Sequence, residues 1–115
     1  MHEISLCLST MELIEQQARQ HGAKRVTAVW LEIGALSCIE EQALRFSFAS
    51  ASRHTLADGC QLRLSYQPAQ AWCWDCSASV YIEQHDAGCP QCGGHTLRVE
   101  SGESLRLKQI EVESF

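Results

Sequence analysis

The chain has 115 residues, which leaves room for one domain and a small additional module. Hydrophobic residues make up 45% of it, and its net charge is −5, with no basic run longer than Lys24-Arg25. This charge argues against a nucleic-acid-binding protein, because such binding depends largely on neutralising phosphates. No apolar stretch resembles a signal peptide or a membrane span, so we expect no membrane association.

The first third of the chain predicts a helix followed by a strand. Residues 3–21 place apolar side chains at the i, i+3, i+4 and i+7 spacing of one helix face, and Gly22 is suited to cap the C-terminus. Residues 25–33 leave little polar surface on either side. We therefore expect them to form a central, largely buried strand.

A second helix and a second strand are predicted next. The pattern Ser37-x-x-Glu40 is a capping box, with a hydroxyl at the N-cap and a carboxylate three residues on, and it opens a helix that runs to about residue 52. Residues 61–66 alternate between apolar and polar side chains, which is typical of a strand with one wet face.

Four cysteines form the most specific motif of the sequence. They make two Cys-x-x-Cys pairs separated by twelve residues: Cys73, Cys76, Cys89 and Cys92. Each pair brings two sulfurs to one point, so four thiolates can surround one zinc ion as a tetrahedron. The alternatives are a four-thiolate iron site, two disulfides or chance, and nearby His95 is a candidate alternative or supporting zinc partner.

Two further strands follow, and they determine the predicted fold class. Residues 96–99 and 105–113 read as strands, and the second of these must join the earlier two because two strands alone are marginal. We therefore predict an α+β fold, in which two helices pack on a three-stranded mixed sheet with an inserted four-cysteine, zinc-ribbon-like module. The predicted domains are a discontinuous α/β domain of residues 1–68 and 97–115, and a zinc-binding module of residues 69–96.

The N-terminal Met1-His2-Glu3 is a second candidate metal site. The terminal amine, the amide nitrogen of residue 2 and the imidazole of His2 can form fused chelate rings, and this planar, nitrogen-rich coordination suits Ni(II) or Cu(II). Alternatively, Glu3 simply opens the first helix against its dipole while His2 is exposed. Glu40 has the same ambiguity, since a capping role explains it without a metal.

These motifs together resemble the HypA/HybF family of hydrogenase maturation proteins. The resemblance rests on Met1-His2-Glu3, the strand end Ile33-Gly34, the Ser37-x-x-Glu40 segment and the two cysteine pairs, in that order along the whole chain. The stretches from Arg25 to Cys38 and from Ala69 to Cys76 look especially like the HybF branch.

The resemblance implies a nickel metallochaperone rather than an enzyme. It implies that Met1, His2 and Glu3 bind the Ni(II) cargo, with help from an acidic side chain that falls on Glu40. It also implies structural zinc at the four cysteines. The expected partners are a HypB-type nickel GTPase and the large subunit of [NiFe]-hydrogenase.

Two other functions are open from the sequence. One is a zinc-ribbon module that binds proteins or nucleic acid and has no nickel function; the other is a metal-dependent hydrolase, for which a closed four-cysteine cage leaves no vacant position. The unpaired Cys7, Cys38 and Cys60 beside a thiolate site suggest a reducing cytoplasm. The protein is expected to be a monomer or a homodimer.

Overall fold

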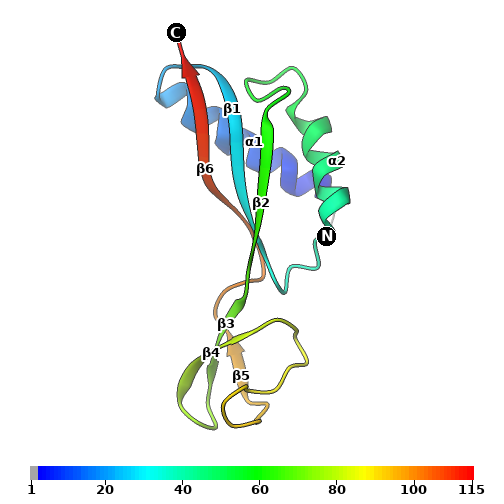
Figure 1. Cartoon of the computed structure of the whole chain (residues 1–115), viewed down its shortest axis with the longest axis vertical. Helices are drawn as coiled ribbons and strands as arrows, with labels where there is room; N and C mark the ends of the chain where they lie inside the picture. The colour runs from blue at the N-terminus through cyan, green and yellow to red at the C-terminus, as the bar shows by residue number, and fades with distance from the viewer. Residues whose placement is uncertain (1–2) are drawn as a thin grey trace. The chain divides into compact units, whose positions relative to one another are not determined.

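The computed structural model describes residues 3–115, in which two helices and six strands form two compact units (Figure 1). In chain order the elements are α1 (Glu3–Gln20), β1 (Ala23–Gly34), α2 (Glu41–Ser52), β2 (Gln61–Gln67), β3 (Ala69–Cys73), β4 (Ala78–Ile82), β5 (Leu97–Val99) and β6 (Leu105–Ser114). Unit 1 holds the residues up to Leu31, Ile39–Leu64 and Arg106–Phe115, and unit 2 holds Glu32–Cys38 and Ser65–Leu105. Within residues 3–115, neither helix combines the length and the apolar character needed to cross a membrane.

Unit 1 is built on a mixed three-stranded sheet. The strand order is β2-β1-β6, and β1 and β2 run in the same direction while β6 runs in the opposite one (Figure 1). α1 packs against α2, and its apolar stripe is buried as the spacing predicts, through Cys7, Met11, Ile14 and Ala18. The predicted α+β class, with two helices and a mixed sheet beside a four-cysteine module, is confirmed.

Unit 2 contains a small antiparallel sheet of order β4-β3-β5. Its core is made mostly of small side chains: Leu36, Ala69, Ala71, Cys73, Val80, Ile82 and Cys89. Neither β3 nor β4 is predicted from the sequence. Segments 32–38, 65–68 and 97–105, which lie in the predicted first domain, also belong to this unit.

Two glycines hold the segments of unit 2 in close contact. The amide of Leu36 donates to the carbonyl of Gly102 at 2.8 Å, and the amide of Gly34 donates to the carbonyl of Ser104 at 3.0 Å. A Cβ atom at Gly34 would overlap the backbone of Gly102, and one at Gly102 would lie 2.5 Å from the Cα of Ala69. Gly102 also has a φ of +95°. Glycine is therefore required at this position both by the close packing and by the backbone conformation.

The start of α2 differs from the predicted capping box. The N-cap is Glu40, whose carboxylate accepts hydrogen bonds from the amides of Gln42 and Ala43 at 3.1 and 2.8 Å. The hydroxyl of Ser37 instead donates to the carbonyl of Gly34 at 2.7 Å. The prediction that Ser37 caps the helix is therefore wrong, because the chain turns through a left-handed Cys38 (φ 58°) before α2 begins.

Candidate metal centre

The four cysteines of the motif come from one strand end and two loops of unit 2. Cys73 is the last residue of β3, and Cys76 lies in the turn that leads to β4. Cys89 and Cys92 lie in the segment between β4 and β5. Positive φ angles at Ser77 (55°) and Gly93 (75°), each directly after the second cysteine of a pair, allow both loops to turn back.

The sulfur atoms are arranged for a single four-coordinate ion. All four lie within 4.8 Å of one another, with Cys73 and Cys92 separated by 3.6 Å and Cys76 and Cys89 by 3.8 Å. A tetrahedral site with Zn–S bonds of about 2.3 Å places its sulfurs about 3.8 Å apart. All four residues are free thiols, so the disulfide alternative does not describe this structure.

Backbone amides give part of this cluster thiolate character. The amides of Gln91 and Gly94 each donate to a sulfur, on Cys89 and Cys92 respectively, at 3.4 Å. Hydrogen bonding from the backbone amide of Cys92, with a further contribution from Gln91, lowers the pKa of the Cys89 thiol to about 7. Burial raises the pKa of Cys76 to about 12, so binding of a metal at this cluster would release protons.

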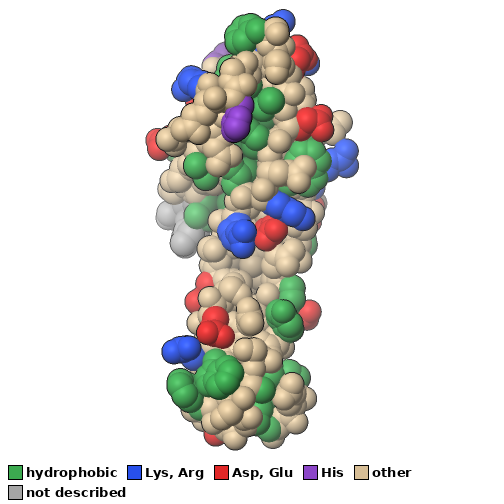
Figure 2. Space-filling model, turned by 90° about the vertical axis from the view of Figure 1, so that its left-hand side faces the viewer, with side chains coloured by type: hydrophobic (Ala, Val, Ile, Leu, Met, Phe, Trp, Pro, Cys, Tyr) green, Lys and Arg blue, Asp and Glu red, His purple; other side chains and the backbone are tan. Residues whose placement is uncertain are grey.

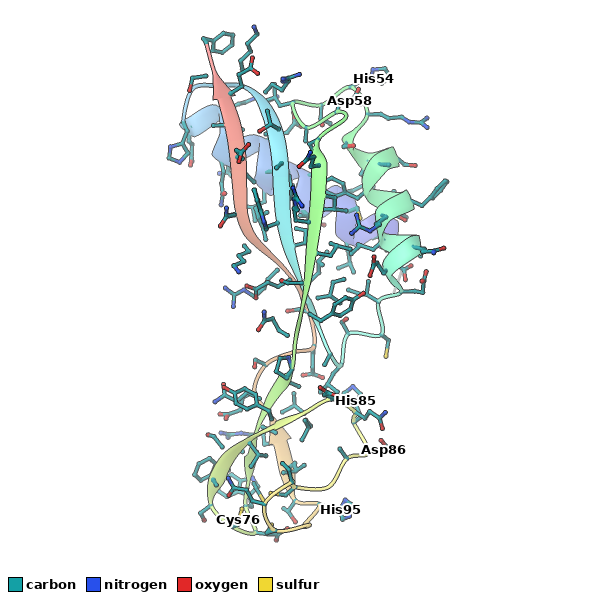
Figure 3. The ribbon with its side chains drawn as sticks, viewed as in Figure 1. His54, Asp58, Cys76, His85, Asp86 and His95 are labelled. Carbon is teal, nitrogen blue, oxygen red and sulfur yellow. The ribbon has the colours of Figure 1, made fainter. Side chains whose placement is uncertain are left out.

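The loops around the sulfurs are fixed by short backbone contacts. The amide of Cys89 donates to the carbonyl of Gly94 at 2.7 Å, and the amide of Gly93 donates to the carbonyl of Cys89 at 2.8 Å. His95 is exposed and its ring lies against Gly88, while the group of possible ligands found among residues 3–115 consists of the cysteines (Figure 3). The supporting role predicted for His95 stays a prediction.

The predicted nickel ligands are only partly within the described residues. Met1 and His2 lie outside them, whereas Glu3 begins α1 and Glu40 caps α2. One turn further along each helix, the Cys7 thiol lies 3.8 Å from the carbonyl of Leu44. The N-terminal ends of α1 and α2 therefore lie on the same side of unit 1, although no contact between Glu3 and Glu40 follows from this.

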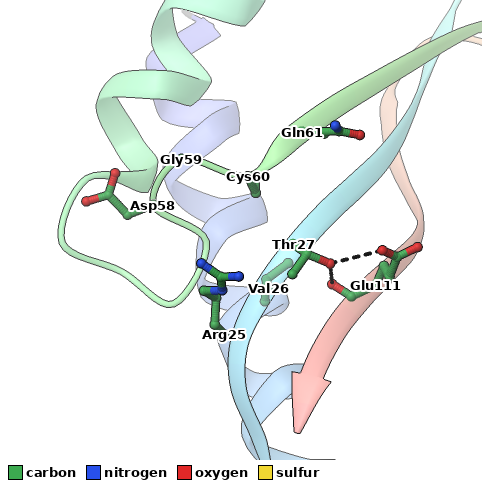
Figure 4. A pocket seen from close by; sticks show the side chains of 8 residues that line it. All are labelled: Arg25, Val26, Thr27, Asp58, Gly59, Cys60, Gln61 and Glu111. Atoms are coloured by element: carbon green, nitrogen blue, oxygen red, sulfur yellow. Dashed lines mark hydrogen bonds between the residues drawn. The ribbon is translucent and has the colours of Figure 1, made fainter.

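The described residues 3–115 also form two pockets in unit 1 that the predicted nickel ligands do not line. The first, of about 310 Å³, is lined by Arg25, Val26, Thr27, Asp58, Gly59, Cys60, Gln61 and Glu111 (Figure 4). Its polar groups have partners: Arg25 pairs with Glu113 at 2.9 Å, and the hydroxyl of Thr27 lies 3.1 Å from the carboxylate of Glu111. The second, of about 400 Å³, lies beside α2 and shares Cys60 with the first.

Comparison with known proteins places the chain in a family. Residues 1–112 match the family model described as "Hydrogenase/urease nickel incorporation, metallochaperone, hypA". Hydrogenase maturation factors HybF from Salmonella typhimurium and Escherichia coli are 65% and 64% identical over 113 residues, which cover 98% of this chain and 100% of each relative. HybF from Morganella morganii is 54% identical over the same coverage.

The fold is shared with solved structures of more distant sequence. The solution structure of the Ni metallochaperone HypA from Helicobacter pylori covers this chain fully, with a TM-score of 0.78 at 22% identity. A second HypA solution structure gives a TM-score of 0.73, also at 22% identity. On the match over nearly its full length and its identity to the HybF relatives, the chain belongs to the HypA family of hydrogenase nickel-incorporation metallochaperones.

Proposed function

We propose that this chain binds Ni(II) and helps to insert it into the large subunit of [NiFe]-hydrogenase during maturation. The observation that carries the proposal is the 65% identity, over all but a few residues, to proteins named hydrogenase maturation factors. Nickel is the cargo in this scheme, so its transfer is an exchange of ligands between two proteins. No bond of an organic substrate is made or broken, and the protein is proposed not to be an enzyme.

The proposed nickel site is Met1-His2-Glu3. The nitrogen donors beside Glu3 are the terminal amine and the amide nitrogen and imidazole of His2. Such nitrogen-rich coordination suits Ni(II) better than zinc. A cation at a helix N-terminus opposes the helix dipole, so nearby carboxylates favour it. Glu3 begins α1 and Glu40 caps α2, and the N-terminal ends of these helices lie on the same side of unit 1. We therefore propose Glu40 as a supporting ligand.

The four cysteines are proposed to hold structural zinc. Their sulfurs are spaced as a closed tetrahedron requires, which leaves no open coordination position for an exchanging ion. A chaperone needs a site that releases its metal, and an N-terminal chelate at the end of a helix suits that need better than a closed cage. The two metals are thus assigned to different ends of the sequence.

The proposed partners follow from the same assignment. A HypB-type nickel GTPase would act together with this chain, and the large subunit of [NiFe]-hydrogenase would receive the nickel. We further propose that this takes place in the cytoplasm, in keeping with three cysteines outside the metal cluster that are free thiols.

The test is titration of the untagged protein with nickel and zinc. His2→Ala should abolish specific nickel binding, because the chelate loses its imidazole, while one zinc per chain is retained. The matched control is His21→Ala, an exposed histidine just after α1, which should bind nickel as the wild type does. A variant with one glycine added before Met1 should behave like His2→Ala. Unchanged nickel affinity in both N-terminal variants would sink the assignment.

A test in cells asks whether nickel delivery depends on the proposed N-terminal site. In cells that lack their own maturation factor of this family, the wild-type chain should restore nickel in the hydrogenase large subunit, and His2→Ala should not. If His2→Ala restores nickel content fully at low external nickel, the delivery role does not depend on this site.

A further inference from the structure

The sheet of unit 2 has an unusual outer face. Its inner face packs the core through Ala71, Cys73 and Val80. The outer side carries large aromatic side chains, and Trp74 and Tyr81 are 57% and 65% exposed. Large side chains exposed together on a small unit mark interaction surfaces far more often than single exposed ones do.

Strand register places these aromatic residues together. Trp72 pairs with Ser79 on β4 and with Arg98 on β5, so Arg98 lies on the same face as Trp72. Tyr81 is two residues beyond Ser79 and therefore projects to this face as well, diagonal to Trp72. We call Trp72, Trp74, Tyr81 and Arg98 the aromatic face. Figure 2 shows hydrophobic side chains exposed on this part of the molecule beside a Lys or Arg side chain and acidic ones.

The aromatic rings on this face already contact one cationic side chain, that of Arg98. Trp72 and Trp74 meet edge to face, with centroids 6.2 Å apart and an interplanar angle of 81°. The guanidinium carbon of Arg98 lies 5.7 Å from the centroid of the Trp74 ring, which is within the range of a cation–π contact. Arg98 also pairs with Glu100 at 3.4 Å. The aromatic face thus contacts a guanidinium that is flanked by a carboxylate, and most of the Tyr81 side chain is exposed to solvent.

The formal charge of unit 2 differs from that of the rest of the chain. Unit 2 contains one basic residue, Arg98, against six acidic residues, a formal charge of −5 that equals the net charge of the whole chain. The acidic residues are Glu32, Asp75, Glu83, Asp86, Glu100 and Glu103. Four thiolates around a divalent ion would add further negative charge. An aromatic surface in this setting repels phosphate backbones and anionic lipid, and it attracts cationic side chains.

We propose that the aromatic face docks a segment of a partner protein that carries Arg or Lys side chains. The cations would stack on Tyr81 and the tryptophan rings, as Arg98 does on Trp74, while the surrounding carboxylates orient the segment. This surface is separate in the sequence from the proposed nickel site, so it goes beyond the proposed function and does not depend on nickel.

The test uses the full-length, zinc-loaded protein and a fluorescent peptide of alternating Arg and Ser. A peptide with citrulline in place of Arg is the matched probe, because it keeps the size and loses the charge. The Arg peptide should bind, the citrulline peptide should bind at least about 5-fold more weakly, and added salt should weaken binding. Tyr81→Ser and Trp74→Ser should each reduce affinity by about 2- to 5-fold or more. Glu83→Gln, two residues after Tyr81, should reduce it without changing the aromatic face.

Phe46→Ser is the control, since Phe46 is 76% exposed on α2 of unit 1. Zinc content and circular dichroism identify any variant that fails to fold, and Tyr81→Ser then replaces Trp74→Ser. In NMR spectra the indole signals of Trp72 and Trp74 should move on peptide addition, while that of Trp30 in unit 1 should not.

Several results would overturn the proposal. They are equal binding of the citrulline peptide, an equal loss in Phe46→Ser, movement of the Trp30 signal alone, or tighter binding of a single-stranded oligonucleotide. Self-association of the chain that is lost in Tyr81→Ser would instead show that the face meets a second copy.

Discussion

Glu40 is the N-cap of α2 and also the proposed supporting ligand of nickel. Both of its carboxylate oxygens accept backbone hydrogen bonds, from Gln42 and Ala43, at the start of α2. A metal ion that uses this carboxylate must compete with those amides. Release of the ion would restore both bonds, so Glu40 would be a weak ligand, as the proposed delivery role requires.

Glu40→Ala should lower the free energy of unfolding by about 1 kcal/mol, because two amides of the first turn lose their acceptor. Urea denaturation followed by circular dichroism measures this change. Glu12→Ala is the control, since Glu12 is an exposed acid in the middle of α1 and its loss changes the net charge equally. Equal stability of the two variants would contradict the capping role.

Residue-level predictions succeeded where the determining geometry is local. The four cysteines could be grouped from their spacing alone, because each x-x turn sets the position of its own two sulfurs. The cap of α2 was predicted wrongly as Ser37, since both Ser37 and Glu40 are able to accept from helix amides. The choice depends on the left-handed backbone of Cys38, for which the pattern carries no signal.

Among the elements, the sequence pattern predicts α1 well and does not predict β3. The helix has a long apolar stripe and a glycine after it, and its predicted bounds agree within one residue with Glu3–Gln20. β3 reads Ala-Gln-Ala-Trp-Cys, in which alanines favour strands little. It is a strand because β4 and β5 pair with it on both sides, which is a tertiary effect.

The contact of β1's end with the segment before β6 depends on Gly34 and Gly102. Gly102→Ala should destabilise unit 2 by roughly 3 kcal/mol or more, because the new Cβ would meet the backbone of Ala69 and the φ is positive. Gly59→Ala separates the two causes, since Gly59 also has a positive φ (73°) but nothing within 4 Å of the added Cβ.

Hydrogen exchange and zinc retention measure the effect of these two glycine variants. Gly59→Ala should cost only about 1 kcal/mol, the strain of the left-handed backbone. If both variants lose equal stability, close packing at Gly102 is not what requires glycine there.

At the scale of the whole molecule, we expect the two units to depend on a bound metal to different degrees, because their cores differ. Unit 1 buries aliphatic and aromatic side chains such as Ile14, Leu31, Leu44 and Phe48. The core of unit 2 consists largely of alanines and of the cysteines themselves. Such a core is too small to hold its loops without the bound ion.

Cys73→Ser should therefore lower zinc content to well below one per chain and broaden the NMR signals of unit 2, while the helical circular dichroism of unit 1 is kept. Cys38→Ser is the matched control, because Cys38 is an exposed free thiol of the same unit. Full zinc retention by Cys73→Ser would contradict a metal-binding role of Cys73. Loss of the helix signal together with zinc would show that unit 1 depends on the metal as well.

The sequence separations within each unit also set an order of folding. Contacts between the cysteine pairs span 13 and 19 residues, whereas Arg25 of β1 meets Glu113 of β6 across 88 residues. Closing short loops is faster than pairing distant strands. We therefore expect the two cysteine loops to close early around a metal ion, and the pairing of β1 with β6 to be a slower step of folding.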